Sequence, residues 1–104
     1  MMQHLVQILL PIHLPDGSDV PPESFARVRG ELTERFGGVT AYSRSPATGL
    51  WKPTETEIER DLVIMIEVVV DVFDRDWWAL YREQLEQRFG QEEVLARAIA
   101  IERI

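Results

Sequence analysis

Hydrophobic and polar positions alternate along two stretches of the chain, and this alternation predicts two strands of one sheet. In residues 4–14 one face is wholly aliphatic and comprises Val6, Ile8, Leu10, Ile12 and Leu14. The opposite face of that strand is mixed and comprises Leu5, Gln7, Leu9, Pro11 and His13. Residues 61–73 repeat the pattern, with one aliphatic face made of Leu62, Ile64, Ile66, Val68, Val70 and Val72.

Two other stretches have apolar residues at spacings of three and four, which predicts amphipathic helices. The first helix follows Pro21-Pro22 and ends at Gly37-Gly38, and its apolar stripe is Phe25, Val28, Leu32 and Phe36. The second helix has Asp74 as its N-cap and ends at Gly90, and its core stripe is Trp78, Tyr81, Leu85 and Phe89. Asp is a preferred N-cap residue, and Gly commonly ends helices.

Two shorter β-prone segments complete the predicted fold. Residues 39–44 favour a strand, and residues 94–104 fit helix or strand, of which strand completes the sheet. We therefore expect one α+β domain over residues 1–104, of the ferredoxin-like βαββαβ type. It would have a four-stranded antiparallel sheet with two helices on one face, and a long loop over residues 45–60.

Composition narrows the range of partners. The 104 residues carry a formal net charge of −7, which disfavours binding to nucleic acid or to anionic membrane surfaces. There is no Cys, so disulfides and thiolate chemistry are excluded. The longest apolar stretch, residues 62–70, contains Glu67 and is too short to span a membrane. We expect a cytoplasmic protein with no cofactor.

The two histidines do not predict a metal site. His4 and His13 lie nine residues apart on one predicted strand, and this odd spacing places their side chains on opposite faces. They cannot share a metal ion within one chain, and we expect no metal site.

The mixed face of the predicted sheet is the main functional clue. It would present Leu5, Leu9, Met65 and Val69 on the side away from the helices. Large exposed apolar patches usually mark interfaces. We therefore expect a homo-oligomer, with a dimer favoured, unless the loop at residues 45–60 covers this face.

Glu67 stands inside the otherwise aliphatic third strand. A carboxylate there is costly to bury alone, so it would pair with Arg44 or Arg97 across the sheet. The alternative is a desolvated general acid or base, with Tyr42 and His13 as neighbouring polar groups. The catalytic candidates are therefore Glu67, Tyr42, His13 and Arg44, and the sequence leaves both interpretations open.

Aromatic residues outside the predicted core suggest contacts with a ligand or partner. The sixteen-residue connection 45–60 is longer than a hairpin needs, and such loops are usually functional. Trp51 would either dock on the sheet or recognise a partner, and Lys52 could bind an anion. Trp77 falls outside the core stripe of its helix and would pack at the flank or at an interface. The binding candidates are therefore Trp51, Lys52, Tyr42 and Trp77.

The run Phe36-Gly37-Gly38-Val39-Thr40-Ala41-Tyr42, followed by Gly49-Leu50-Trp51, resembles a pattern in small bacterial proteins with no assigned activity. The resemblance covers about residues 32–52. It implies a ferredoxin-like fold with a long loop after the second strand, and it implies no activity.

Two functions fit these observations. The first is a homo-oligomeric binding or regulatory module that uses the open sheet face and the Trp51 loop to bind a small molecule or a protein. The second is a cofactor-free enzyme of the dimeric α+β-barrel kind, similar to oxygenases or isomerases, acting on a small molecule. This second analogy rests on architecture alone.

Overall fold

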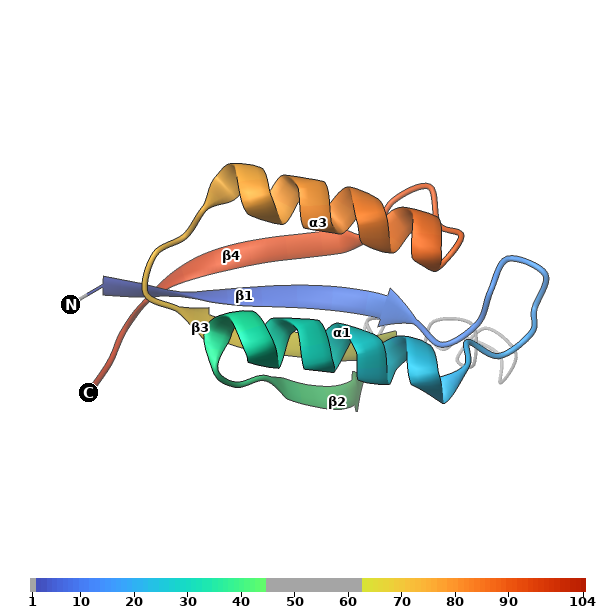
Figure 1. Cartoon of the computed structure of the whole chain (residues 1–104), viewed down its shortest axis with the longest axis horizontal. Coiled ribbons are helices and arrows are strands. Elements are labelled where there is room, and N and C mark those ends of the chain that lie inside the picture. Colours follow the sequence, from blue (N-terminus) through green and yellow to red (C-terminus); the bar gives the residue numbers. More distant parts are fainter. Residues whose placement is uncertain (1, 45–62) are drawn as a thin grey trace, which may run out of the picture.

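The computed structural model of the chain describes residues 2–44 and 63–104, with the backbone alone for residues 41–44. Its elements are β1 (Met2–Pro11), α1 (Pro22–Phe36), β2 (Thr40–Arg44), β3 (Val63–Val70), α3 (Arg75–Arg88) and β4 (Leu95–Glu102). The strands form one antiparallel sheet in the order β2-β3-β1-β4. Figure 1 shows α1 running over β3 and β2, and α3 running alongside β4. The predicted α+β class is confirmed.

The central strand β1 sets the register of the sheet. Ile8 lies opposite Ile66 of β3 on one side and opposite Ala96 of β4 on the other. One residue earlier, Gln7 lies between Glu67 and Arg97. Because side chains alternate along a strand, the Ile8 row and the Gln7 row point to opposite faces of the sheet.

The core lies between the sheet and the two helices, as the aliphatic faces predict. Val6, Ile8 and Leu10 of β1 are buried. They pack with buried residues of β3, α1 and α3, namely Ile66, Val68, Val70, Val28, Leu32, Trp78, Tyr81 and Leu85. Each aliphatic side chain of this size contributes about 1.5–3 kcal/mol when it is fully buried.

The helix ends follow the sequence signals. Pro22 stands in the first turn of α1, and Gly37 ends that helix in the left-handed conformation, with φ 85°. This conformation is open to glycine without the steric cost of a Cβ. The Asp74 side chain accepts a hydrogen bond from the Trp77 backbone N–H at 3.1 Å, which confirms the predicted N-cap.

The predicted C-terminal ends of the first and third strands are wrong. β1 stops at Pro11, which has no N–H to donate to a neighbouring strand, so Ile12 and Leu14 fall outside it. β3 stops at Val70 and does not continue to residue 73. Val72 is therefore exposed instead of facing the core.

The predicted fold also needs a correction in its architecture. The expectation was a ferredoxin-like, four-stranded sheet, but the regular part of the sheet is the three long strands β3, β1 and β4. β2 is a five-residue edge strand that pairs with β3 alone, from Thr40 to Arg44. The strand order β2-β3-β1-β4 is therefore the description that the pairing supports. The predicted loop at residues 45–60 lies outside the described residues.

Candidate functional site on the open sheet face

A row of polar side chains crosses the sheet face that lies away from the helices. Gln7 stands at its centre and is buried. Its Nε2 donates a hydrogen bond to Oε2 of Glu67 at 2.6 Å. Its Oε1 accepts one from Nε of Arg97, also at 2.6 Å. The single amide of Gln7 thus connects an acid on β3 to a base on β4.

The register explains why these three residues meet. Gln7 is paired with Glu67 in one strand contact and with Arg97 in the other, so all three side chains point to the same face. An amide offers both donors and an acceptor, which lets it bind a carboxylate and a guanidinium at once. Of the two partners predicted for Glu67, Arg97 is linked to it through Gln7, while the side chain of Arg44 is not described.

Apolar residues flank this polar row on both sides. Leu9 and Met65 lie on one side, and Leu5 with Val69 on the other. These residues differ in burial: Met65 is fully buried, whereas Val69 is 47% exposed. On β4, Leu95 and Ile99 are 48% and 46% exposed on the same face. The open face therefore leaves large apolar side chains of two strands in contact with solvent.

Beside Glu67 the surface is hollow. A depression of about 500 Å³ is lined by Leu5, Glu67 and Val69 of the sheet and by residues 36–40 at the end of α1. Thr40 lies opposite Glu67 in the strand register. Glu67 and the exposed Val69 are neighbours in its wall, because they lie two residues apart on β3 and so on the same face.

The structure separates His13 from Glu67, the catalytic candidate at the centre of the open face. His13 lies beyond the end of β1, six residues after Gln7, which is about 20 Å along an extended chain. Its Nε2 lies 3.2 Å from Oδ1 of Asp19, in an isolated bridge between the two residues. Tyr42 lies on β2 opposite Met65, and its side chain is not described.

The three other predicted binding residues fall in two places. Trp51 and Lys52 lie outside the described residues. Trp77 lies on the opposite side of the sheet, half-buried between the helices. Its ring meets that of Phe36 edge-on at 5.4 Å, and the Arg35 guanidinium lies 4.3 Å from its centroid. Trp77 therefore packs α3 against the C-terminal end of α1.

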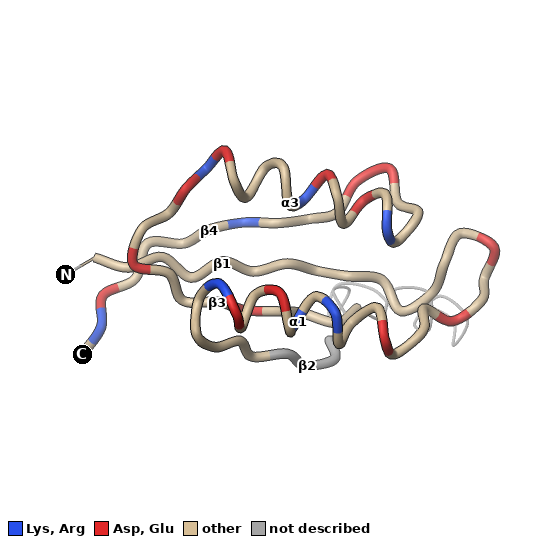
Figure 2. The backbone as a smooth tube through the Cα atoms, in the orientation of Figure 1, with Lys and Arg blue, Asp and Glu red and all other residues tan. Residues whose placement is uncertain are grey.

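Glu67 and Arg97 could be identified as partners from the sequence, but the role of Gln7 between them could not. The signal was present, since Gln7 is the polar residue in the middle of the mixed face of β1. Only the register shows that it faces both charged residues. Figure 2 shows that β1 itself carries no charge, while acidic residues gather in the loop after β1 and beyond α3.

Within residues 2–44 and 63–104, no group of three His, Asp or Glu side chains could hold a metal ion. In the same part of the chain, no helix is long and apolar enough to cross a membrane. Comparisons with protein-family models, curated proteins and solved structures found no match to this chain.

Proposed function

We propose that this protein is a homo-oligomeric binding module whose open sheet face contacts a second copy of the chain. The observation that supports this is the set of half-exposed apolar residues on that face, Val69, Leu95 and Ile99. Burial of apolar surface contributes about 25 cal/mol per Å², so covering these side chains favours association. Exposed apolar patches of this kind commonly mark protein interfaces.

The order of charges along the polar row supports a second copy of the chain as the partner that contacts this face. In a twofold dimer the same patch faces itself, so each residue must meet its complement. The row is acidic at Glu67, neutral at Gln7 and basic at Arg97. A twofold axis parallel to β1 would place Glu67 of each copy opposite Arg97 of the other. The same rotation would set Val69 against Ile99, which are both apolar.

The catalytic alternative has less support. Glu67 and Arg97 each bind Gln7, and His13 pairs with Asp19 far from them. A general acid or base must reach the proton it transfers, and these groups do not converge on one point. The role of Trp51 and Lys52 in recognising a ligand stays a prediction.

Sedimentation equilibrium of the purified protein tests the proposal. We expect the wild type to be a dimer, and Val69→Lys or Ile99→Lys to shift it to the monomer. Leu80→Lys is the matched control, because Leu80 is an exposed leucine on α3, away from the open face. A wild type that stays monomeric at millimolar concentration would contradict the proposal. So would a control that dissociates the dimer as strongly as the test variants.

Charge reversal tests the arrangement of the two copies. Glu67→Arg alone and Arg97→Glu alone should each weaken the homodimer, because like charges would then face each other. An equimolar mixture of the two variants should form a heterodimer, since every facing pair is again opposite in charge. A mixture that associates no better than either variant alone would exclude this twofold arrangement.

A further inference from the structure

A second cavity lies on the helix side of the sheet, between α3 and the strands β1 and β4. Its volume is about 360 Å³, within the range of small-molecule sites. Ala96, Ala98 and Ala100 of β4 face this side, since they pair with Ile8, Val6 and His4. Their short side chains leave space where larger residues would have met α3. The cavity thus exists because β4 carries alanines at alternate positions.

One wall of the cavity is apolar. Val6 and the three alanines form the floor, and Phe73 stacks against His4 with ring centroids 5.3 Å apart. Trp78, only 6% exposed, closes the side towards the core. A flat apolar group would fit against these aromatic and methyl surfaces.

Three residues that line the cavity each have a buried polar atom without a hydrogen-bond partner within the described residues. These atoms are Nδ1 of His4, Nε1 of Trp78 and Nε of Arg82. Buried polar groups are nearly always hydrogen-bonded, so each such atom calls for an explanation. Two of the three, the indole N–H and the guanidinium N–H, can only donate, so their missing partner is an acceptor.

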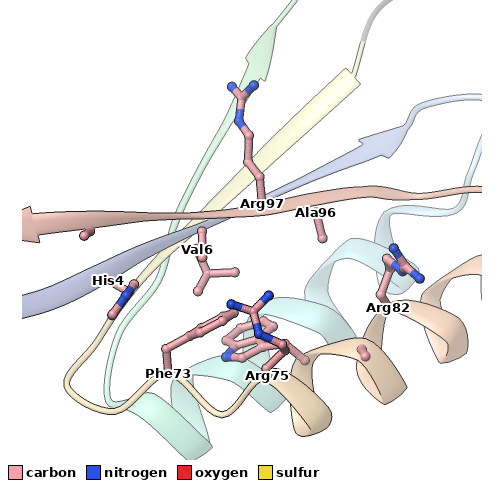
Figure 3. A pocket seen from close by; sticks show the side chains of 11 residues that line it. His4, Val6, Phe73, Arg75, Arg82, Ala96 and Arg97 are labelled. Carbon is pink, nitrogen blue, oxygen red and sulfur yellow. The ribbon is translucent and has the colours of Figure 1, made fainter.

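Two arginines make the cavity basic in a chain whose net charge is −7. Arg75 and Arg82 lie two turns apart on one side of α3, and Figure 3 shows both rising towards the strands. Within residues 2–44 and 63–104, neither has an ion pair or a hydrogen bond, and the Arg75 guanidinium lies 5.3 Å from the centroid of the Phe73 ring. Arg97 points away to the open face and leaves the cavity to the other two (Figure 3).

We propose that this cavity binds a small organic anion, a carboxylate with a flat apolar body. The carboxylate accepts hydrogen bonds from Arg82 and from the Trp78 indole, and Arg75 adds a second positive charge. Hydrogen bonds between guanidinium and carboxylate are among the stronger ones in proteins. The apolar body lies on Ala96, Ala98 and Ala100 of β4. The site is separate from the open face, so it does not depend on the proposed dimer.

Nuclear magnetic resonance tests the proposal with naphthoate as the probe. The indole N–H signal of Trp78, assigned with Trp78→Phe, should shift on titration at millimolar concentration. The neutral isostere naphthamide should bind at least tenfold more weakly, since loss of one charged hydrogen bond costs about a factor of ten. Inorganic phosphate, which lacks the apolar body, should leave the signal nearly unchanged.

Variants distinguish binding in this cavity from a general effect of the protein's charge on naphthoate binding. Arg82→Gln and Arg75→Gln should each weaken naphthoate binding by about tenfold. Arg29→Gln, at an exposed arginine of α1, is the matched control and should bind as the wild type does. Ala98→Leu should fill the cavity and abolish binding, while its circular dichroism spectrum stays that of the wild type.

Four results would overturn the proposal. They are an unmoved Trp78 signal, equal binding of naphthoate and naphthamide, phosphate binding as tight as naphthoate, and arginine variants that bind like the control. A monomeric protein that still binds naphthoate would contradict only the proposed dimer.

Discussion

Arg88 of α3 forms a bidentate ion pair with Glu31 of α1. Nη1 of Arg88 donates to Oε1 of Glu31 at 2.6 Å, and Nη2 donates to Oε2 at 2.9 Å. The Tyr81 hydroxyl donates to the same Oε1 at 2.9 Å. One carboxylate thus holds two side chains of the other helix. These hydrogen bonds join α1 to α3 on the helix side of the sheet.

Glu31→Gln should destabilise the protein at neutral pH but not in acid. The hydrogen bond from Arg88 is the main reason that the pKa of Glu31 is lowered from 4.5. A lowered folded pKa gives stability that is present above the unfolded pKa and is lost as the pH falls through the folded value. Because 36% of the side chain is exposed, we expect a difference of about 1 kcal/mol, screened by solvent.

Urea unfolding of both proteins at pH 7 and at pH 3 measures this difference. Glu34→Gln, at an exposed glutamate of the same helix, is the control and should change stability little at either pH. An equal loss of stability at both pH values for Glu31→Gln would contradict the electrostatic explanation.

We expect Tyr81 to ionise only at high pH, and Tyr81→Phe should remove this ionisation. Burial, followed by the hydrogen bond to Glu31, raises the pKa of Tyr81 well above 10. A raised pKa gives stability that is present below the unfolded pKa and is lost as the pH rises through the folded value. We expect alkaline absorbance titration of the wild type to show a late component that Tyr81→Phe lacks. The variant should lose about 1 kcal/mol at pH 7, the cost of one hydrogen bond.

Gln7→Leu should lower the free energy of unfolding by more than the similar size of the two side chains suggests. The change removes the amide that binds both Glu67 and Arg97 and leaves two charged groups without that partner. Hydrogen bonds to charged groups contribute about 1.5–3 kcal/mol each, so we expect a loss of about 2–4 kcal/mol in urea unfolding.

Gln3→Leu is the matched control for that experiment. Gln3 lies on the same strand and face, and its amide donates to Asp71 at 2.7 Å in an exposed setting. Its replacement should cost less than 1 kcal/mol, because solvent can take over the lost contact. Equal losses in both variants would show that the polar row adds no stability beyond an exposed pair.

Leu85→Ala should test the core between α3 and the sheet. Leu85 is fully buried, and truncation of such a leucine costs about 2–5 kcal/mol. Leu80→Ala on the same helix removes the same atoms from an exposed site, and it should change stability by less than 0.5 kcal/mol. Thermal and chemical unfolding of the pair measure both effects. Similar losses in the two variants would contradict the helix orientation described above.

Much of the fold follows from local patterns in the sequence. The alternation around Ile8 and Ile66 determined which side of each strand is buried, since side chains alternate with a period of two. The spacing of Trp78, Tyr81 and Leu85 likewise determined the buried face of α3. The strand ends were harder to predict, because they depend on where pairing partners stop, as at Pro11.

The sequence also pointed to the open face, since a mixed face with several leucines and valines is visible without coordinates. It could not identify the link through Gln7, because Glu67 and Arg97 lie 60 and 90 residues away from it in the chain. The alternate alanines of β4 can likewise be read from the sequence. They form a cavity only because α3 packs above them, which the sequence does not show.

Short-range chemistry, which the sequence carries by itself, determined the elements, their buried faces and the Asp74 cap. Tertiary structure alone decided which distant residues share a face. Strand register brought Gln7 between Glu67 and Arg97, and helix packing set Arg75, Arg82 and Trp78 around one cavity. The physical reason is that a side chain's partners across a sheet or a helix contact are set by pairing over long chain distances, and no local pattern encodes that pairing.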